Sequence, residues 1–326
     1  MLLKKLIKKS KNKFYRTVSS VYDKPLASPT EKEKELIREL KTAFSNLPSL
    51  CMTNCSQSEK EWNNNLYRLR ELVLNDDPRQ FLRWDVILRT MFAAHAGYVF
   101  PELKYLRTRL DWNSRWSKAI VESRSGHPIP HWQYPSSSGN LIHHAYHVAQ
   151  FEEKTKTRVD GMNFIIEFGG GYGSMCRLFY NLGFRGKYII FDLPEFSALQ
   201  EFFLKSIGIT VCSTDSFNNS KEGAYCVSDL EKLKAIQSNH EEMSNSMFIA
   251  TWSISEAPIY LRNSILSLIS SFKAFLIGYQ DQFGEVSNID FFKNYAVAHS
   301  DIKWWDWKIE HLHSENRYMM GQKKNK

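Results

Sequence analysis

The chain has 326 residues, of which 43% are hydrophobic and 14% aromatic, enough for a sizeable core in one large domain or two smaller ones. No apolar run approaches the ~20 residues that cross a bilayer, which excludes a membrane-spanning protein. The net charge of +8 lies at the ends: taking away seven cations in residues 1–22 and three in the last five residues leaves about −2. Nucleic-acid enzymes usually carry a basic surface on the folded body, so the sequence predicts no nucleic-acid partner.

The first 20 residues, MLLKKLIKKSKNKFYRTVSS, predict a basic amphipathic helix. Such a helix can lie on an anionic membrane surface; the alternative is a disordered basic tail. Its apolar core is too broken for a secretory signal. Five scattered cysteines indicate a reduced, cytosolic protein. We therefore expect a cytoplasmic protein, with peripheral contact to the inner face of the membrane through residues 1–20 as a further expectation.

Residues 23–150 are expected to form a helical region that serves as a lid, between a tail at 1–22 and a domain at 151–326. The patterns predict helices at 31–46 and 58–74. A single long helix is predicted over 77–98, where Pro78 stands at the first helical position. A turn-rich break at 126–140 precedes a helix at about 140–157.

From Asn163 onward, apolar runs alternate with helical patterns. Strands interleaved with helices indicate right-handed crossovers and a parallel sheet. Two further strands, in IKWWDWKIEHLHSENRYMMG, predict an antiparallel hairpin at the sheet edge. The predicted fold is therefore α/β, with a mostly parallel Rossmann-like sheet. Its parallel strands are expected at 163–168, 187–191, 209–212, 246–251 and 273–279.

A glycine loop follows the first of these strands. A dinucleotide site favours G-x-G-x-x-G, but after Gly169 and Gly171 the third position is Ser174. Glu167 ends the strand, where a carboxylate would repel a pyrophosphate and attract an ammonium or sulfonium group. S-adenosylmethionine carries both cations and no phosphate. Asp192 ends the next strand, the usual place of a carboxylate that binds ribose hydroxyls.

The segment EFGGGYGSMCRL resembles the E-x-G-x-G-x-G motif of class I methyltransferases. Together with FDLPEFSALQ, TWSISE and GYQDQFGEVSN, it resembles the sugar O-methyltransferases of bacterial surface-polysaccharide gene clusters over roughly residues 120–326. The resemblance implies S-adenosylmethionine as cofactor and a hydroxyl of a sugar or glycan precursor as acceptor. Another small-molecule hydroxyl, an NAD-linked oxidoreductase and a non-catalytic scaffold of the same fold are the alternatives.

Methyl transfer to a hydroxyl needs alignment of three atoms and a group that takes the proton. In plant phenolic O-methyltransferases a histidine after the fourth strand is the base; here Ser255 and Glu256 stand there, so Glu256 is the first candidate. The alternative is a capping box in which Ser253 and Glu256 begin a helix. His127, in the turn-rich break, is the second candidate base.

Other positions in the sequence bear on metal and cofactor binding. His143 and His147 share a helical face, but without H-E-x-x-H and a nearby acid we predict no metal. Asp215 is the preferred adenine contact and Asp229 its alternative. Trp252 is expected to pack on adenine or substrate, or in the core. The predicted cofactor-binding residues are Glu167, Gly169, Gly170, Gly171, Gly173, Asp192, Asp215 and Trp252.

Overall fold

The computed structural model describes residues 17–50, 57–238, 245–312 and 315–324. The chain divides into two compact units, Met1–Tyr146 and His147–Lys326, and the division falls within helix α7 (Gly139–Thr155). Most of the predicted amphipathic tail, residues 1–16, lies outside the described residues. Among the described helices, none is long and apolar enough to cross a membrane.

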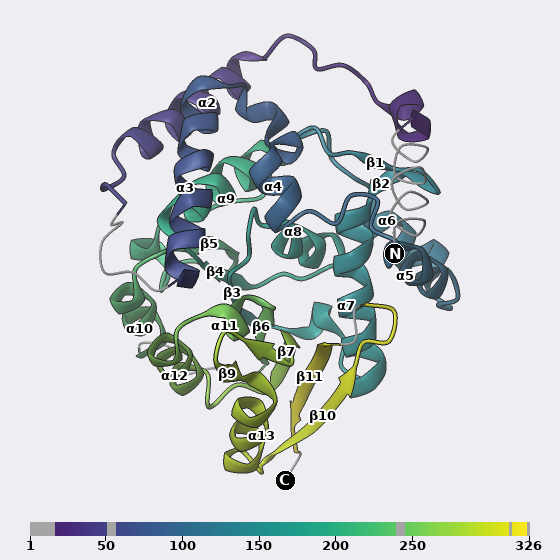
Figure 1. Cartoon of the computed structure of the whole chain (residues 1–326), viewed down its shortest axis with the longest axis vertical. Coiled ribbons are helices and arrows are strands. Elements are labelled where there is room, and N and C mark those ends of the chain that lie inside the picture. Colours follow the sequence, from purple (N-terminus) through teal and green to yellow (C-terminus); the bar gives the residue numbers. More distant parts are fainter. Residues whose placement is uncertain (1–16, 51–56, 239–244, 313–314, 325–326) are drawn as a thin grey trace. The chain divides into compact units, whose positions relative to one another are not determined.

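The first unit consists mainly of helices, as predicted (Figure 1). Thr30 begins α2 with a capping box, because its side chain accepts from Glu33 N–H while Glu33 accepts from the Thr30 backbone. The turn-rich break contains a short antiparallel pair, β1 and β2. The elements are α2 (Glu31–Ser45), α3 (Gln57–Asn75), η1 (Pro78–Arg83), α4 (Asp85–Thr90), α5 (Val99–Arg107), η2 (Trp112–Trp116), α6 (Ser117–Ala119), β1 (Pro130–His131) and β2 (Tyr134–Ser138).

The single helix predicted over 77–98 is wrong. The backbone of Trp84 is extended (φ −66°, ψ 141°) and separates the 3-10 turn η1 from α4. Two contacts hold this break: the Trp84 indole donates to Asp76 at 3.0 Å, and Leu82 N–H donates to Gly126 O at 3.0 Å. The helical periodicity is present in the sequence, but contacts with distant residues override such a pattern when they satisfy the backbone.

The second unit contains a seven-stranded sheet in the order β10-β11-β7-β6-β3-β4-β5. The five strands from β7 to β5 are parallel, and β11 and β10 form the predicted antiparallel hairpin at one edge. The strands are β3 (Phe164–Phe168), β4 (Lys187–Phe191), β5 (Gly223–Val227), β6 (Ser246–Thr251), β7 (Ala274–Gln280), β10 (Ile302–Lys308) and β11 (Asn316–Lys323), and a separate pair is β8 (Gln282–Phe283) with β9 (Val286–Ser287).

Helices cover both faces of this sheet. One face packs against α10, α12 and α13 in a buried cluster that includes Ile236, Ile265 and Phe292. The other face packs against α8, where Phe179 contacts Tyr188 of β4 edge-on. The helices are η3 (Val159–Gly161), α8 (Ser174–Asn181), α9 (Pro194–Ser206), η4 (Thr214–Ser216), α10 (Leu230–Ser238), α11 (Ser253–Glu256), α12 (Ile259–Leu268) and α13 (Asn288–Ala298).

The strand predicted at 209–212 differs from the observed one. That segment makes only an isolated bridge, Val211 with Ala224, while residues 223–227 form the strand beside β4. The chain runs outward from β3 to β4 and β5, and then returns to place β6 on the other side of β3. The strand order therefore reverses between β3 and β6. Ligands of open α/β sheets bind at the carboxyl ends of the strands at such a switch point.

Gly186 tests how closely β3 and β4 approach at their first residues. A Cβ at Gly186 would lie 2.3 Å from Asn163 O, whereas a Cβ at Gly161 would meet nothing within 4 Å. We expect Gly186→Ala to lower the free energy of unfolding by about 1–3 kcal/mol, because the backbone must shift. Gly161→Ala should change it by less than ~0.5 kcal/mol. Urea denaturation of both variants measures this, and equal stabilities would contradict the close approach.

Candidate active site

The glycine loop connects β3 to α8 at the switch point. Gly169, Gly171 and Gly173 have φ of 71°, 58° and 92°, in the left-handed region that other residues seldom adopt. A Cβ at Gly169 would lie 2.3 Å from Ser253 Cβ, so this position admits only glycine without rearrangement. The loop ends at Gly173, the N-cap of α8. The backbone N–H groups of the first helical turn therefore stand beside the loop.

Glu167 lies beneath this loop rather than in the open. Its side chain is almost fully buried, and it accepts a hydrogen bond from Tyr188 Oη at 2.9 Å. A Cβ at Gly170 would lie 2.9 Å from Glu167 Oε2, which shows how closely the loop covers the carboxyl. Burial raises the pKa of Glu167 to about 8, although the Tyr188 hydroxyl opposes this and the charge of Asp192 adds to it.

Asp192 follows β4 and holds the loop from the other side. Its Oδ2 accepts from Gly171 N–H and from Gln200 Nε2, both at 3.0 Å, and its Oδ1 accepts from Leu193 N–H at 2.8 Å. Burial raises the pKa of Asp192 to about 7, against the effect of these hydrogen bonds. A carboxylate has about four acceptor positions. Donors from the described part of the chain occupy three of these, which leaves one acceptor position on Oδ1.

The two candidate adenine contacts lie in different surroundings. Asp215 is exposed in η4, where its N–H donates to Ser213 Oγ at 3.2 Å. Asp229 follows β5, and its Oδ1 accepts from Glu231 N–H at the start of α10. The end of β5 is also next to Asp192, because Asp192 N–H donates to Val227 O at 3.0 Å. Asp229 therefore belongs to the same end of the sheet as Asp192.

Trp252 follows β6 with an unusual backbone. Its φ is 66°, a genuine outlier for a bulky residue and a feature that concentrates at functional sites. Its N–H donates to Gly278 O and its indole Nε1 to Asn316 Oδ1, both at 2.6 Å. These partners belong to β7 and β11. Trp252 therefore lies on the side of the sheet away from β4 and β5.

Glu256 ends the short helix α11, and the capping box considered for it is absent. Ser253 Oγ donates to Phe168 O instead. The Glu256 carboxyl accepts from Gln280 Nε2 at 3.3 Å, which places it at the carboxyl ends of β6 and β7. Burial raises its pKa, while the Gln280 amide and the charge of Arg262 pull it down. The structure thus leaves the carboxyl available for a role other than capping.

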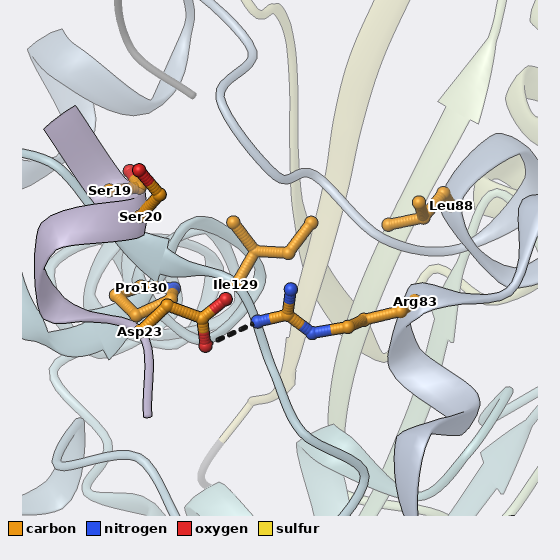
Figure 2. A pocket seen from close by; sticks show the side chains of 7 residues that line it. All are labelled: Ser19, Ser20, Asp23, Arg83, Leu88, Ile129 and Pro130. Carbon is orange, nitrogen blue, oxygen red and sulfur yellow. Dashed lines mark hydrogen bonds and ion pairs between the residues drawn. The ribbon is translucent and has the colours of Figure 1, made fainter. Parts of the chain in front are cut away.

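His127 lies in the first unit and binds its own neighbours. Its Nε2 is 3.0 Å from Asp23 Oδ1, and its backbone carbonyl accepts from Arg83 Nε at 2.9 Å. Arg83 also pairs with Asp23 at 2.8 Å beside a pocket of about 330 Å³ (Figure 2). These contacts tie the segment around Asp23 to η1, so the ring has a clear structural role. The pocket is lined by Ser19, Ser20, Asp23, Arg83, Leu88, Ile129 and Pro130.

The helix histidines also have protein partners. His143 Nδ1 is 2.8 Å from Glu102 in the first unit, and His147 Nδ1 bonds to Tyr318 Oη in the second. Sequence reasoning missed Tyr188, Gln200 and Gln280, which hold the site's carboxyl groups. Of these three, only Tyr188 could have been inferred from the sequence. In the parallel pairing of β3 with β4, Glu167 lies opposite Ile190, and Tyr188, two residues before Ile190, lies on the same face of the sheet.

The chain matches no protein-family model and no curated protein. It is similar to an rRNA methylase from Streptococcus thermophilus, with 12% identity, 56% of this chain and 95% of that chain covered, and a TM-score of 0.38. It is also similar to magnesium protoporphyrin IX methyltransferase from Synechocystis PCC 6803 with bound SAM (9%, 71% and 99%, 0.36). A third is a SAH-bound methyltransferase from Podospora anserina (11%, 71% and 91%, 0.37).

The exclusion of a nucleic-acid partner is wrong. The similar structures include the rRNA methylase and a complex of fibrillarin. The prediction relied on the net charge of the folded body. A net charge near zero does not exclude a local basic surface, and nucleic acid binds to local positive potential.

The raised pKa of Glu167 gives a testable pH dependence. A carboxyl with a folded-state pKa of about 8 binds its proton more tightly when folded than when unfolded. It therefore favours the folded state below its unfolded pKa of ~4.3, and this contribution is lost as the pH rises toward 8. We expect Glu167→Gln to lose less stability than wild type between pH 5 and about 8 in thermal denaturation. Parallel curves for the two proteins would show that Glu167 is ionised when buried.

Proposed function

We propose that the chain is an S-adenosylmethionine-dependent O-methyltransferase that acts on a hydroxyl of a sugar or glycan precursor. One observation carries this proposal. Glu167, which is buried, and Asp192, which is half-buried, both have raised pKa values and flank a glycine loop at the switch point of the sheet. An anionic ligand would add to the cost of their ionisation, whereas a cationic ligand would offset it.

S-adenosylmethionine fits this chemistry. Its sulfonium and ammonium groups supply the positive charge, and the glycine loop lets its methionine part approach the backbone. A ribose hydroxyl can donate to the open acceptor position of Asp192. Asp229, after β5, is the better placed of the two adenine candidates. NAD fits less well, because its pyrophosphate would lie against a loop that covers Glu167.

The acceptor end is assigned to the strand ends of β6 and β7. Glu256 is the proposed base, and Gln280 is the amide beside it. A carboxyl and an amide suit a ligand rich in hydroxyl groups, since both form hydrogen bonds with them. Trp252 adds a flat apolar surface next to these polar groups. The resemblance of FDLPEF and TWSISE to sugar O-methyltransferases supports the same acceptor class.

Calorimetric titration with S-adenosylmethionine and with NAD tests the cofactor. We expect S-adenosylmethionine to bind, and Asp192→Ala to weaken its binding about ten- to a hundred-fold, because hydrogen bonds to a charged group worth roughly 1.5–3 kcal/mol are lost. Asp215→Ala, on the exposed turn, is the matched control and should leave the affinity unchanged. Gln200→Ala measures how much of the loss comes from loosening the loop. Unchanged affinity in Asp192→Ala would reject the site.

Glu256→Gln tests the base, because it keeps the shape of the side chain and removes its charge. Mass spectrometry of surface glycan from a strain lacking the gene identifies the methylated acceptor directly, by the methyl group that disappears. We expect turnover to fall ~10²-fold or more on that acceptor, while affinity for S-adenosylmethionine stays close to wild type. Full activity of the variant would move the role of base elsewhere. A glycan unaffected by loss of the gene would turn the search to other acceptors, RNA among them.

A further inference from the structure

Arg262 of α12 is a buried cation at the acceptor end of the second unit. It is 1% exposed, although arginine is almost never fully buried unless it is paired. Its three nitrogens donate to three different oxygens: Nε to Ala257 O at 2.7 Å, Nη1 to Asn288 Oδ1 at 2.6 Å, and Nη2 to Ser255 O. All three acceptors are neutral, so the charge itself needs another partner.

Two groups act on that charge: the Phe291 ring of α13, whose centroid lies 5.3 Å from the guanidinium carbon, and the Glu256 carboxyl. In the described part of the chain, Arg262 makes no direct ion pair, and its electrostatic neighbour is the Glu256 carboxyl, which favours the charged guanidinium. The two carbonyls that Arg262 binds belong to Ser255 and Ala257, the residues on either side of Glu256. The guanidinium therefore donates hydrogen bonds to the backbone on both sides of Glu256, and its positive charge lowers the pKa of the Glu256 carboxyl.

A second connection runs through Asn288 at the start of α13. Asn288 accepts from Arg262 and donates from Nδ2 to Gln280 O at 2.9 Å. The Gln280 side chain in turn binds Glu256 through Nε2 and Ser255 Oγ through Oε1. Arg262 thus reaches Glu256 by two routes, one through the backbone of α11 and one through β7.

We propose that Arg262 is the positioning residue of this site, which fixes α11 through the carbonyls of Ser255 and Ala257 so that the Glu256 carboxyl faces the acceptor. This inference rests on the proposed function, because it assumes that Glu256 takes the acceptor's proton. Arginine suits the role better than lysine, since its planar fork can bind several oxygens at fixed angles and it stays charged when buried.

Arg262 is the charged group that acts on the titration of Glu256. Burial, the largest effect, disfavours the ionised carboxyl, and the hydrogen bond from the Gln280 amide favours it more strongly than the charge of Arg262 does. Asp281, directly after β7, is another acidic group of this region, and its backbone carbonyl accepts from Asn288 N–H at 3.0 Å. Removal of the Arg262 charge should therefore move the titration of Glu256 upward.

The experiment measures that titration directly, without an acceptor. Glutamate labelled with ¹³C at the carboxyl carbon is followed by NMR, and the Glu256 signal is identified by its absence in Glu256→Gln. We expect Arg262→Gln to raise the titration midpoint of Glu256 by about one pH unit or more. Arg262→Lys should keep the midpoint within about 0.5 of wild type. Arg185→Gln is the matched control, because Arg185 also binds backbone carbonyls but is exposed and far along the chain.

Hydrogen exchange supplies the second readout, in case Arg262→Gln does not fold. Lysine cannot make all the hydrogen bonds of the guanidinium group. In Arg262→Lys, amide hydrogen exchange in residues 251–258 should therefore become about tenfold faster, while that in the glycine loop stays unchanged. An unchanged Glu256 midpoint in folded Arg262→Gln, or unchanged exchange in Arg262→Lys, would overturn the inference. Failure of the wild-type chain to bind S-adenosylmethionine would instead overturn the proposed function, so the two failures are distinguishable.

Discussion

The buried carboxyl of Glu167 is the constraint on which the glycine loop depends. An ionised carboxylate in an apolar interior is so costly that such a group shifts its pKa or finds a partner. Here both happen: the pKa of Glu167 rises to about 8 and Tyr188 donates to the carboxyl. The loop above it must pass within contact distance, which only glycine at position 170 permits. The glycine at position 170 and the buried Glu167 carboxyl therefore depend on each other.

The two halves of the site are joined at the switch point. Ser253, after β6, donates to Phe168 O at the end of β3, and it packs against Gly169 where no other residue would fit. The chain can reach this position because Trp252 adopts a left-handed backbone, which costs of order 1–3 kcal/mol. Hydrogen bonds from Trp252 to strands β7 and β11 offset part of that cost. A change in the segment after β6 would therefore also affect the glycine loop.

The sheet and the loop were predictable from the sequence because both depend on local pattern: short apolar runs form the strands, and glycines stand where the backbone is left-handed. The break at Trp84 was not predictable, because it depends in part on the hydrogen bond from the Trp84 indole to Asp76, which a helical pattern of apolar residues does not indicate. The strand predicted at 209–212 was wrong because two apolar segments, 209–212 and 223–227, have similar patterns. In the structure residues 223–227 pair with β4 in parallel register, and Val211 makes only an isolated bridge with Ala224. The carboxyl partners Gln200 and Gln280 carry no sequence signal, because glutamines are common on such helices and strand ends.

Glu167 and Glu256 are two carboxyl groups in different electrostatic surroundings. Glu167 is buried and Glu256 half-buried, and the loss of water raises both pKa values. Their charged neighbours differ in sign: the charge of Asp192 raises the pKa of Glu167, whereas the charge of Arg262 lowers the pKa of Glu256. A carboxyl beside another carboxyl holds its proton until a cation arrives, which suits the recognition of a positively charged cofactor. A carboxyl beside a cation loses its proton more readily than a carboxyl beside an acid, which suits the proton acceptor that we propose Glu256 to be. Opposed environments of this kind are how proteins assign different protonation states to the same side chain.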